Sequence, residues 1–148
     1  MARRLLGLLL LAMAIGQLSD LGGFVGILET YRLGGGITAA VLAPALVAGE
    51  LLAGIGLLRS RTGHRPATMA VAVGATWTVL AALAFARGLD LPNCGCFGVH
   101  AGQPLRWWVL VEDAQFIALA LWVRHRALET GSAHHVAEVT ERTRETLS

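Results

Sequence analysis

The chain contains two cysteines, Cys94 and Cys96, which lie one residue apart in the segment Asn93-Cys94-Gly95-Cys96-Phe97-Gly98. A close pair of thiols has three chemical uses: it can cycle between dithiol and disulfide, bind a soft metal ion, or close a loop. A bridge over one residue requires a tight turn that brings the Cα atoms within about 7 Å, and the resulting small ring is strained. Because a strained disulfide is easily reduced, this spacing favours thiol–disulfide exchange over a purely stabilising role.

Two other functions stay open for this segment. His100 follows Cys96 by a short interval, and two sulfurs with one imidazole nitrogen suit Cu(I) or Zn(II). Cys94, Cys96 and His100 would then form the entry site of a metal-handling or small-solute transport protein, with Glu50 on the path. Alternatively the loop is structural, and the protein is a non-catalytic assembly factor.

Three acidic residues lie inside apolar segments. Glu50 lies within residues 37–58, and a charge at membrane depth costs on the order of 2.5–3.5 kcal/mol. We therefore expect Glu50 to face the protein interior, where it is either hydrogen-bonded to a neighbouring helix or handles protons. Glu112 and Asp113 lie near the start of the segment 107–123, at the level of the cysteines. These three carboxyl groups are the candidates for proton transfer beside the thiol pair.

Composition places the chain in a membrane. It has 148 residues, of which 55% are hydrophobic and 15% charged, and this is too apolar for an ordinary soluble domain. The net charge of +2 is not gathered into a stripe that would bind nucleic acid. Apolar runs of about 20 residues cross the roughly 30 Å hydrocarbon layer as helices. The sequence predicts an all-α, integral membrane four-helix bundle over residues 1–125, with spans at about residues 5–19, 37–58, 67–86 and 107–123.

The arginines predict the orientation of these spans, because cytoplasmic loops carry the excess of positive charge. The cytoplasmic segments should be those with Arg3 and Arg4, with Arg59, Arg61 and Arg65, and with Arg124 and Arg126. Both termini are then cytoplasmic, and the cysteine loop faces the extracytoplasmic side of a bacterial cytoplasmic membrane, where disulfides persist. Residues 126–148 are predicted to form a flexible cytoplasmic tail that is at most partly helical.

Two features qualify the simple four-span pattern. The amphipathic stretch between residues 20 and 36 predicts a short helix on the outer interface between spans one and two. The first span, with Arg3 and Arg4 before it and Ala12-Met13-Ala14 within it, also has the pattern of a cleavable signal peptide.

Small residues at four-residue spacing predict close packing of helices. They include Ala12 and Gly16, Ala45, Gly49 and Ala53, and Ala70 and Gly74.

The cysteine segment and the residues after it resemble the methylamine utilisation protein MauE family, a group related to the DoxX-like membrane proteins. Four segments carry the resemblance, which covers about residues 5–125: Cys94-Gly95-Cys96-Phe97-Gly98, Gln103-Pro104-Leu105, Trp107-Trp108 and Glu112-Asp113-Ala114. The resemblance implies a four-helix membrane bundle and an accessory role in forming disulfides in an extracytoplasmic partner, helped by a thioredoxin-like protein. It also implies that Cys94 and Cys96 are the redox pair and that Glu50 is a family acid without an assigned role.

Two residues depart from the family pattern. Gln17 stands where relatives often carry Lys, and Asn93 stands where an acid often precedes the first cysteine, so the charge around the thiols differs. The chain also lacks the second cysteine pair through which oxidases of the vitamin K epoxide reductase kind relay electrons. Electrons from Cys94 and Cys96 would therefore pass to another protein or directly to a quinone in the bilayer. Nothing in the chain indicates methylamine itself.

Overall fold

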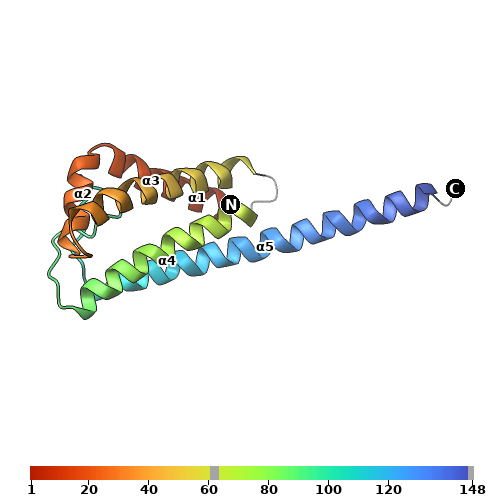
Figure 1. Cartoon of the computed structure of the whole chain (residues 1–148). Coiled ribbons are helices and arrows are strands. Elements are labelled where there is room, and N and C mark those ends of the chain that lie inside the picture. Colours follow the sequence, from red (N-terminus) through yellow and green to blue (C-terminus); the bar gives the residue numbers. More distant parts are fainter. Residues whose placement is uncertain (61–63, 147–148) are drawn as a thin grey trace.

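The computed structural model describes the backbone of residues 1–60 and 64–146. Helices are the only regular secondary structure in this part of the chain, and loops connect them (Figure 1). The five helices are α1 (Ala2–Leu18), α2 (Leu21–Thr30), α3 (Gly36–Arg59), α4 (His64–Ala86) and α5 (Trp107–Thr146). The predicted all-α class is confirmed; three predicted spans lie within α3, α4 and α5, and the first, at about residues 5–19, extends one residue beyond the end of α1. Arg61, which we assigned to a cytoplasmic link, lies outside the described residues.

Two of the helices, α3 and α4, are long and apolar enough to cross a membrane. A third crossing is added if α1 and α2, which are bent by 96° at the break between them, count as one broken span. The predicted four spans are therefore supported only in part. α5 is not among the helices that are apolar enough to cross, and its apolar portion contains the charged residues Glu112 and Asp113.

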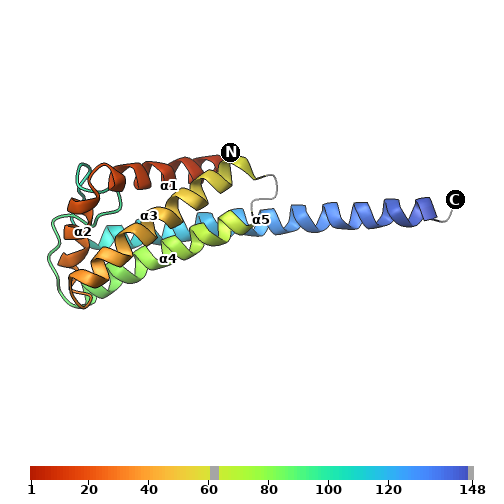
Figure 2. The ribbon, with the colours of Figure 1, turned by 45° about the horizontal axis from the view of Figure 1, so that its top comes forward.

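The helices form a packed group with one helix laid across its end (Figure 2). α1 packs on α3, α3 on α4, and α4 on α5, while α1 and α5 contact each other more loosely. α2 contacts α3 and turns away from the axis of α1. The predicted short helix between the first two apolar segments is thus present, and its N-terminus is capped by Asp20, whose Oδ1 accepts from the Gly23 N–H at 2.8 Å.

Glycines bring the helices close together at three contacts. A Cβ on Gly7 would lie 3.1 Å from the carbonyl oxygen of Gly54, so α1 and α3 meet through their backbones. A Cβ on Gly49 would lie 3.0 Å from Val73, and one on Gly74 would lie 2.6 Å from Phe116. The packing role that the spacing predicts for Gly49 and Gly74 is confirmed.

The C-terminal segment differs from the prediction. Instead of a tail that is at most partly helical, residues 126–146 continue α5 without a break. The low hydrophobicity of this segment suggested little structure, but it contains no proline and is rich in residues with high helix propensity. Side-chain contacts one turn apart support the helix where it leaves the packed group: His125 Nε2 lies 3.3 Å from Glu129 Oε1, and Arg126 forms an ion pair with Glu129 Oε2 at 3.9 Å.

The two ends of the packed helices differ in character (Figure 1). At one end, Arg3 donates a hydrogen bond to the Ser60 carbonyl, and Arg124 Nε donates to Thr68 Oγ1 at 3.2 Å. The N-terminus, the end of α3 and the start of α4 therefore gather with a part of α5. The other end holds α2 and the segment 87–106 that connects α4 to α5. The arginines of the predicted cytoplasmic segments that the structure describes lie at the opposite end of the packed helices from the cysteine segment.

Candidate functional site: a thiol pair facing a cavity

The cysteine loop is held in shape by its own hydrogen bonds. The Cys94 N–H donates to the Gln103 carbonyl at 2.7 Å, and the Leu105 N–H donates to the Leu91 carbonyl at 2.9 Å, so the two arms of the loop are joined. Asn93 closes the tip: its Oδ1 accepts from the Gly95 N–H at 2.9 Å, and its Nδ2 donates to the Gly98 carbonyl at 3.0 Å. An acidic residue at this position would lack that amide donor.

The loop rests directly on the end of α1. A Cβ on Gly16 would clash with the carbonyl of Phe97, and a Cβ on Gly98, whose φ is +73°, would clash with the carbonyl of Gly16. The spacing of Ala12 and Gly16 predicted a contact between helices. Gly16 instead makes room for the backbone of the cysteine loop, which a pattern of small residues cannot distinguish from a neighbouring helix.

The residue between the cysteines packs on aromatic side chains. Gly95 has a φ of +88°, and a Cβ there would lie 3.4 and 3.5 Å from Phe24 and Trp77. The hydroxyl of Tyr31, at the end of α2, donates to the Cys94 carbonyl at 2.7 Å. Burial, aided by the nearby thiols, raises the pKa of Tyr31 above its ordinary value, so the phenol keeps the proton that it donates.

The two sulfur atoms lie 3.5 Å apart, and both cysteines are free thiols. Cys94 is 3% exposed, whereas Cys96 is partly exposed. The hydrogen bond from the Cys96 thiol lowers the pKa of Cys94 to about 7, against the opposing effect of burial. The same interaction and burial raise the pKa of Cys96 well above the ordinary thiol value. Near neutral pH the pair therefore holds one thiolate, on Cys94, and one thiol, on Cys96.

A buried polar network connects the loop to the helices. The side-chain amide of Gln17 donates to Glu50 Oε1 at 3.1 Å and to the Cys96 carbonyl at 3.0 Å. The indole N–H of Trp77 donates to the same Glu50 oxygen at 2.9 Å. Gln17 and Glu50 are both fully buried. Glu50 was predicted to face the interior, and the structure places it beneath the cysteine loop, one side chain away from it.

Sequence reasoning missed Trp77 as a part of this site. The other tryptophans lie near the ends of apolar segments, where they are typical membrane anchors. Trp77 lies in the middle of such a segment, and a buried indole N–H needs an acceptor. Glu50 is the acid in the middle of the preceding segment. The two signals together indicate the pair, although neither does so alone.

The two acids of α5 have different surroundings. Glu112 Oε2 accepts from Gln103 Nε2 at 2.9 Å, so the loop also contacts α5. Asp113 Oδ2 is buried and has no hydrogen-bond partner among the described residues. The prediction that both acids lie at the level of the cysteines is confirmed, since both line one cavity with the two thiols.

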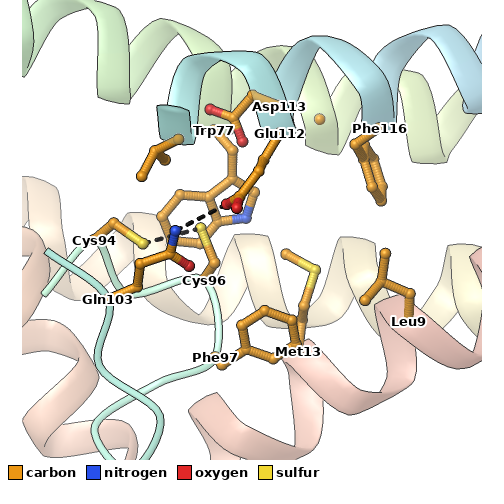
Figure 3. Close-up of a pocket in the computed structure, with 12 residues that line it drawn as sticks. Leu9, Met13, Trp77, Cys94, Cys96, Phe97, Gln103, Glu112, Asp113 and Phe116 are labelled. Atoms are coloured by element: carbon orange, nitrogen blue, oxygen red, sulfur yellow. Dashed lines mark hydrogen bonds between the residues drawn. The ribbon is translucent and has the colours of Figure 1, made fainter. Parts of the chain in front are cut away.

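That cavity has a volume of about 310 Å³ and lies between α1, α4, α5 and the loop (Figure 3). In Figure 3, Leu9 and Met13 approach from α1, while Asp113 and Phe116 approach from α5 on the opposite side. Both sulfurs are part of the wall. The lining residues are Leu9, Met13, Gly74, Trp77, Cys94, Cys96, Phe97, Gln103, Val109, Glu112, Asp113 and Phe116.

The predicted alternative of a metal site does not form. Among the described side chains, which are those of residues 1–60, 64–130, 142 and 143, no group of three or more His, Cys, Asp and Glu is arranged to hold a metal ion. His100 is exposed beyond the Gly98 turn, whereas Cys94 is buried. The short sequence separation suggested a shared site, but the turn does not bring the imidazole together with the thiols.

Comparisons with known proteins identify a family for this chain. The family model described as methylamine utilisation protein MauE matches residues 1–125. The methylamine utilization protein MauE of Paracoccus denitrificans is 28% identical over 119 residues, which are 80% of this chain and 64% of that relative. The matched region is therefore less than two thirds of the relative's length. No solved structure matches the chain. The chain belongs to the methylamine utilisation protein MauE family.

Proposed function

We propose that this protein is a membrane thiol–disulfide redox protein that assists disulfide formation in an extracytoplasmic partner protein, with Cys94 and Cys96 as the redox pair. The observation that carries the proposal is the 3.5 Å separation of two free sulfurs in the wall of one cavity. Two thiols at this distance need only small side-chain rotations to bond.

The difference between the two cysteines assigns them different roles. Cys96 is partly exposed, so a thiolate of the partner attacks this sulfur when the pair is a disulfide. Cys94 leaves as the thiolate, because its pKa of about 7 makes it the better leaving group. A second partner thiolate then attacks the mixed disulfide, Cys96 is released, and the partner gains a disulfide. Two electrons have moved from the partner to the pair.

The carboxyl groups divide between proton transfer and support. Asp113 has a buried oxygen without a partner beside the sulfurs, so we assign proton transfer to it. Glu112 is bound by Gln103 and lies at the edge of the same site. Glu50 Oε1 accepts two hydrogen bonds and holds Gln17 under the loop. Its Oε2 is also buried without a partner among the described residues, but Glu50 does not line the cavity, so we assign it a positioning role.

The proposed membrane placement has four crossings, by α1, α3, α4 and the first part of α5, with α2 on the outer interface. Large apolar side chains exposed on these helices would contact lipid; they include Leu5, Leu8, Ile15, Val41, Leu52, Val79 and Leu121. The arginine-rich end would face the cytoplasm, and the cysteine loop would face the extracytoplasmic side of a bacterial cytoplasmic membrane. Both termini are then cytoplasmic.

The name of the Paracoccus relative suggests the biological setting. We propose that the partner is an extracytoplasmic protein of methylamine use whose disulfides this protein helps to form, with a thioredoxin-like protein as an intermediary. The redox chemistry proposed for the site acts on thiols, because the two sulfurs are the redox-active groups in the cavity wall.

Trapping of thiols in intact cells tests this function. The pair should be a mixture of dithiol and disulfide that shifts when a reductant is added. Cys94→Ser should accumulate a mixed disulfide between Cys96 and a partner protein, and Cys96→Ser, the matched control, should accumulate much less. A pair locked in one state under all conditions, or full function in the double serine variant, would show that the loop is structural.

A further inference from the structure

The cavity beside the thiols lies at the seam between α1 and α5, two helices that contact each other only loosely. α1 and α5 contact each other less than the sequential pairs α1 and α3, α3 and α4, or α4 and α5 do. Leu9 and Met13 of α1 face Val109 and Phe116 of α5 across this gap. Leu9 is 37% exposed, so the seam is bordered by an apolar side chain that also reaches the surface. An apolar molecule dissolved in the bilayer would enter the cavity between these two helices.

The size and lining of the cavity limit what it binds. Its volume of about 310 Å³ lies at the lower end of the range of roughly 300–1,000 Å³ that is typical of small-ligand sites. The side chains of Trp77, Phe97 and Phe116 offer aromatic surfaces to a planar ring. The unpartnered Asp113 Oδ2 is a buried polar atom that a ligand oxygen or hydroxyl would satisfy.

The electrons of the thiol pair need an acceptor. The chain has no cysteines besides Cys94 and Cys96, so it cannot pass electrons to a second pair of its own. Both sulfurs line this one cavity, and an acceptor that enters it meets them directly. We propose, on the basis of the redox function proposed above, that the cavity binds the head group of a lipid-soluble quinone, which oxidises Cys94 and Cys96 to a disulfide.

The reaction balances with the groups present. The Cys94 thiolate and the Cys96 thiol form one S–S bond and give up two electrons and one proton. The quinone takes both electrons, the Cys96 proton and a second proton from Asp113, which takes that proton from water before the quinone binds, and becomes a hydroquinone. Water returns a proton to Asp113 after the product has left. A hydroxyl of the hydroquinone then hydrogen-bonds to the same Asp113 oxygen that the quinone carbonyl contacted before the reaction.

The test uses the full-length protein, reduced and placed in nanodiscs without oxygen, with decylubiquinone as the probe. We expect one hydroquinone for each thiol pair oxidised. Leu9→Trp should fill the cavity and slow quinone reduction at least tenfold. Leu8→Trp is the matched control, because Leu8 lies on the same helix, is 56% exposed and does not line the cavity. It should change the rate less than twofold.

A separate measurement distinguishes this inference from the proposed function. Exchange of the thiol pair with oxidised glutathione needs no quinone. A pair that exchanges with glutathione but never reduces decylubiquinone would refute the quinone site and leave the redox function standing. A pair that does neither would refute both.

Direct labelling covers the case in which Leu9→Trp disturbs the fold. A photoreactive quinone should label peptides from α1 and the start of α5, and decylubiquinone should compete with the label. The double variant Cys94→Ser/Cys96→Ser should be labelled equally, because binding does not require the thiols. Labelling confined to other helices, or labelling that does not compete, would overturn the proposal.

Discussion

The α-carbon of Gly98 lies against the carbonyl of Gly16, with no side chain between the cysteine loop and the last turn of α1. A loop held this closely by another backbone has little freedom to move away from it. The position of the two thiols is therefore set by the first helix of the chain as much as by the loop itself.

Gly16→Ala should displace the loop. The added methyl group would clash with the Phe97 carbonyl, and overpacking of this kind destabilises by about 1–3 kcal/mol. Thermal unfolding in detergent should show a lower Tm, and Cys94 should be alkylated faster. Gly26→Ala is the matched control, because nothing lies within 4 Å of a Cβ at Gly26. An equal loss of stability in the two variants would contradict the close contact.

The thiolate of the pair should titrate near neutral pH. The alkylation rate of the reduced protein should rise as the pH passes through about 7, because the Cys96 thiol stabilises the Cys94 thiolate. In Cys96→Ala that donor is lost, and burial should move the transition to higher pH. The measurement is the alkylation rate against pH for both proteins. Identical profiles would show that the thiols do not interact.

Glu50→Gln should preserve the fold, because glutamine keeps an oxygen that accepts from Trp77 and Gln17. We expect a change in unfolding free energy within about 1 kcal/mol and normal exchange with glutathione. Glu50→Ala leaves two buried N–H groups without an acceptor, that of the Trp77 indole and one of the two on the Gln17 amide. The variant should lose at least about 2 kcal/mol of unfolding free energy. Loss of exchange in a stable Glu50→Gln protein would instead assign proton transfer to Glu50.

Tyr31→Phe removes the hydroxyl that donates to the buried Cys94 carbonyl. An unsatisfied buried carbonyl costs about 1–3 kcal/mol, so the variant should unfold at a lower temperature than the native protein. Thr30→Val is the control, since the Thr30 hydroxyl bonds the Ile27 carbonyl at an exposed position. A difference in Tm between the two variants is expected, and its absence would mean that Tyr31 does not support the loop.

Asp113→Asn should slow quinone reduction by roughly tenfold or more, because an amide cannot supply the proton. Labelling by the photoreactive quinone should remain, since the amide still fills the same space. Glu112→Gln keeps an oxygen for Gln103 and should have a smaller effect on the rate. Rates measured in nanodiscs at one pH compare the two variants. A larger loss in Glu112→Gln would reverse the roles of the two acids.

The sequence predicted the helices and one end of the site well. Apolar runs and glycines determine where helices form locally, and Glu112 and Asp113 follow the cysteines closely enough to share their level. The link between Glu50 and the loop was not predictable in the same way. It depends on α1 ending at Leu18 and on the rotation of α3 and α4 about their axes, which bring Gln17 and Trp77 to one oxygen.

The helical continuation of α5 shows a different limit. Low hydrophobicity indicates that a segment has little to bury, but a helix anchored by its packed first half can extend beyond the packing. Propagation of an existing helix is easier than its nucleation, so helix propensity then decides the outcome. About half of residues 126–146 are Ala, Leu, Glu or Arg, which favour a helix, and hydrophobicity was the wrong measure there.

The hydrogen bond from Gln17 to the Cys96 carbonyl joins residues that are 79 positions apart in the chain. During synthesis the first helix therefore waits for most of the protein to emerge before this contact can form. Contacts between such distant positions form late, since the intervening chain must first be ordered. Until then the cysteine loop lacks its hydrogen bond from Gln17, so the arrangement of the site is complete only after both ends of this contact have folded.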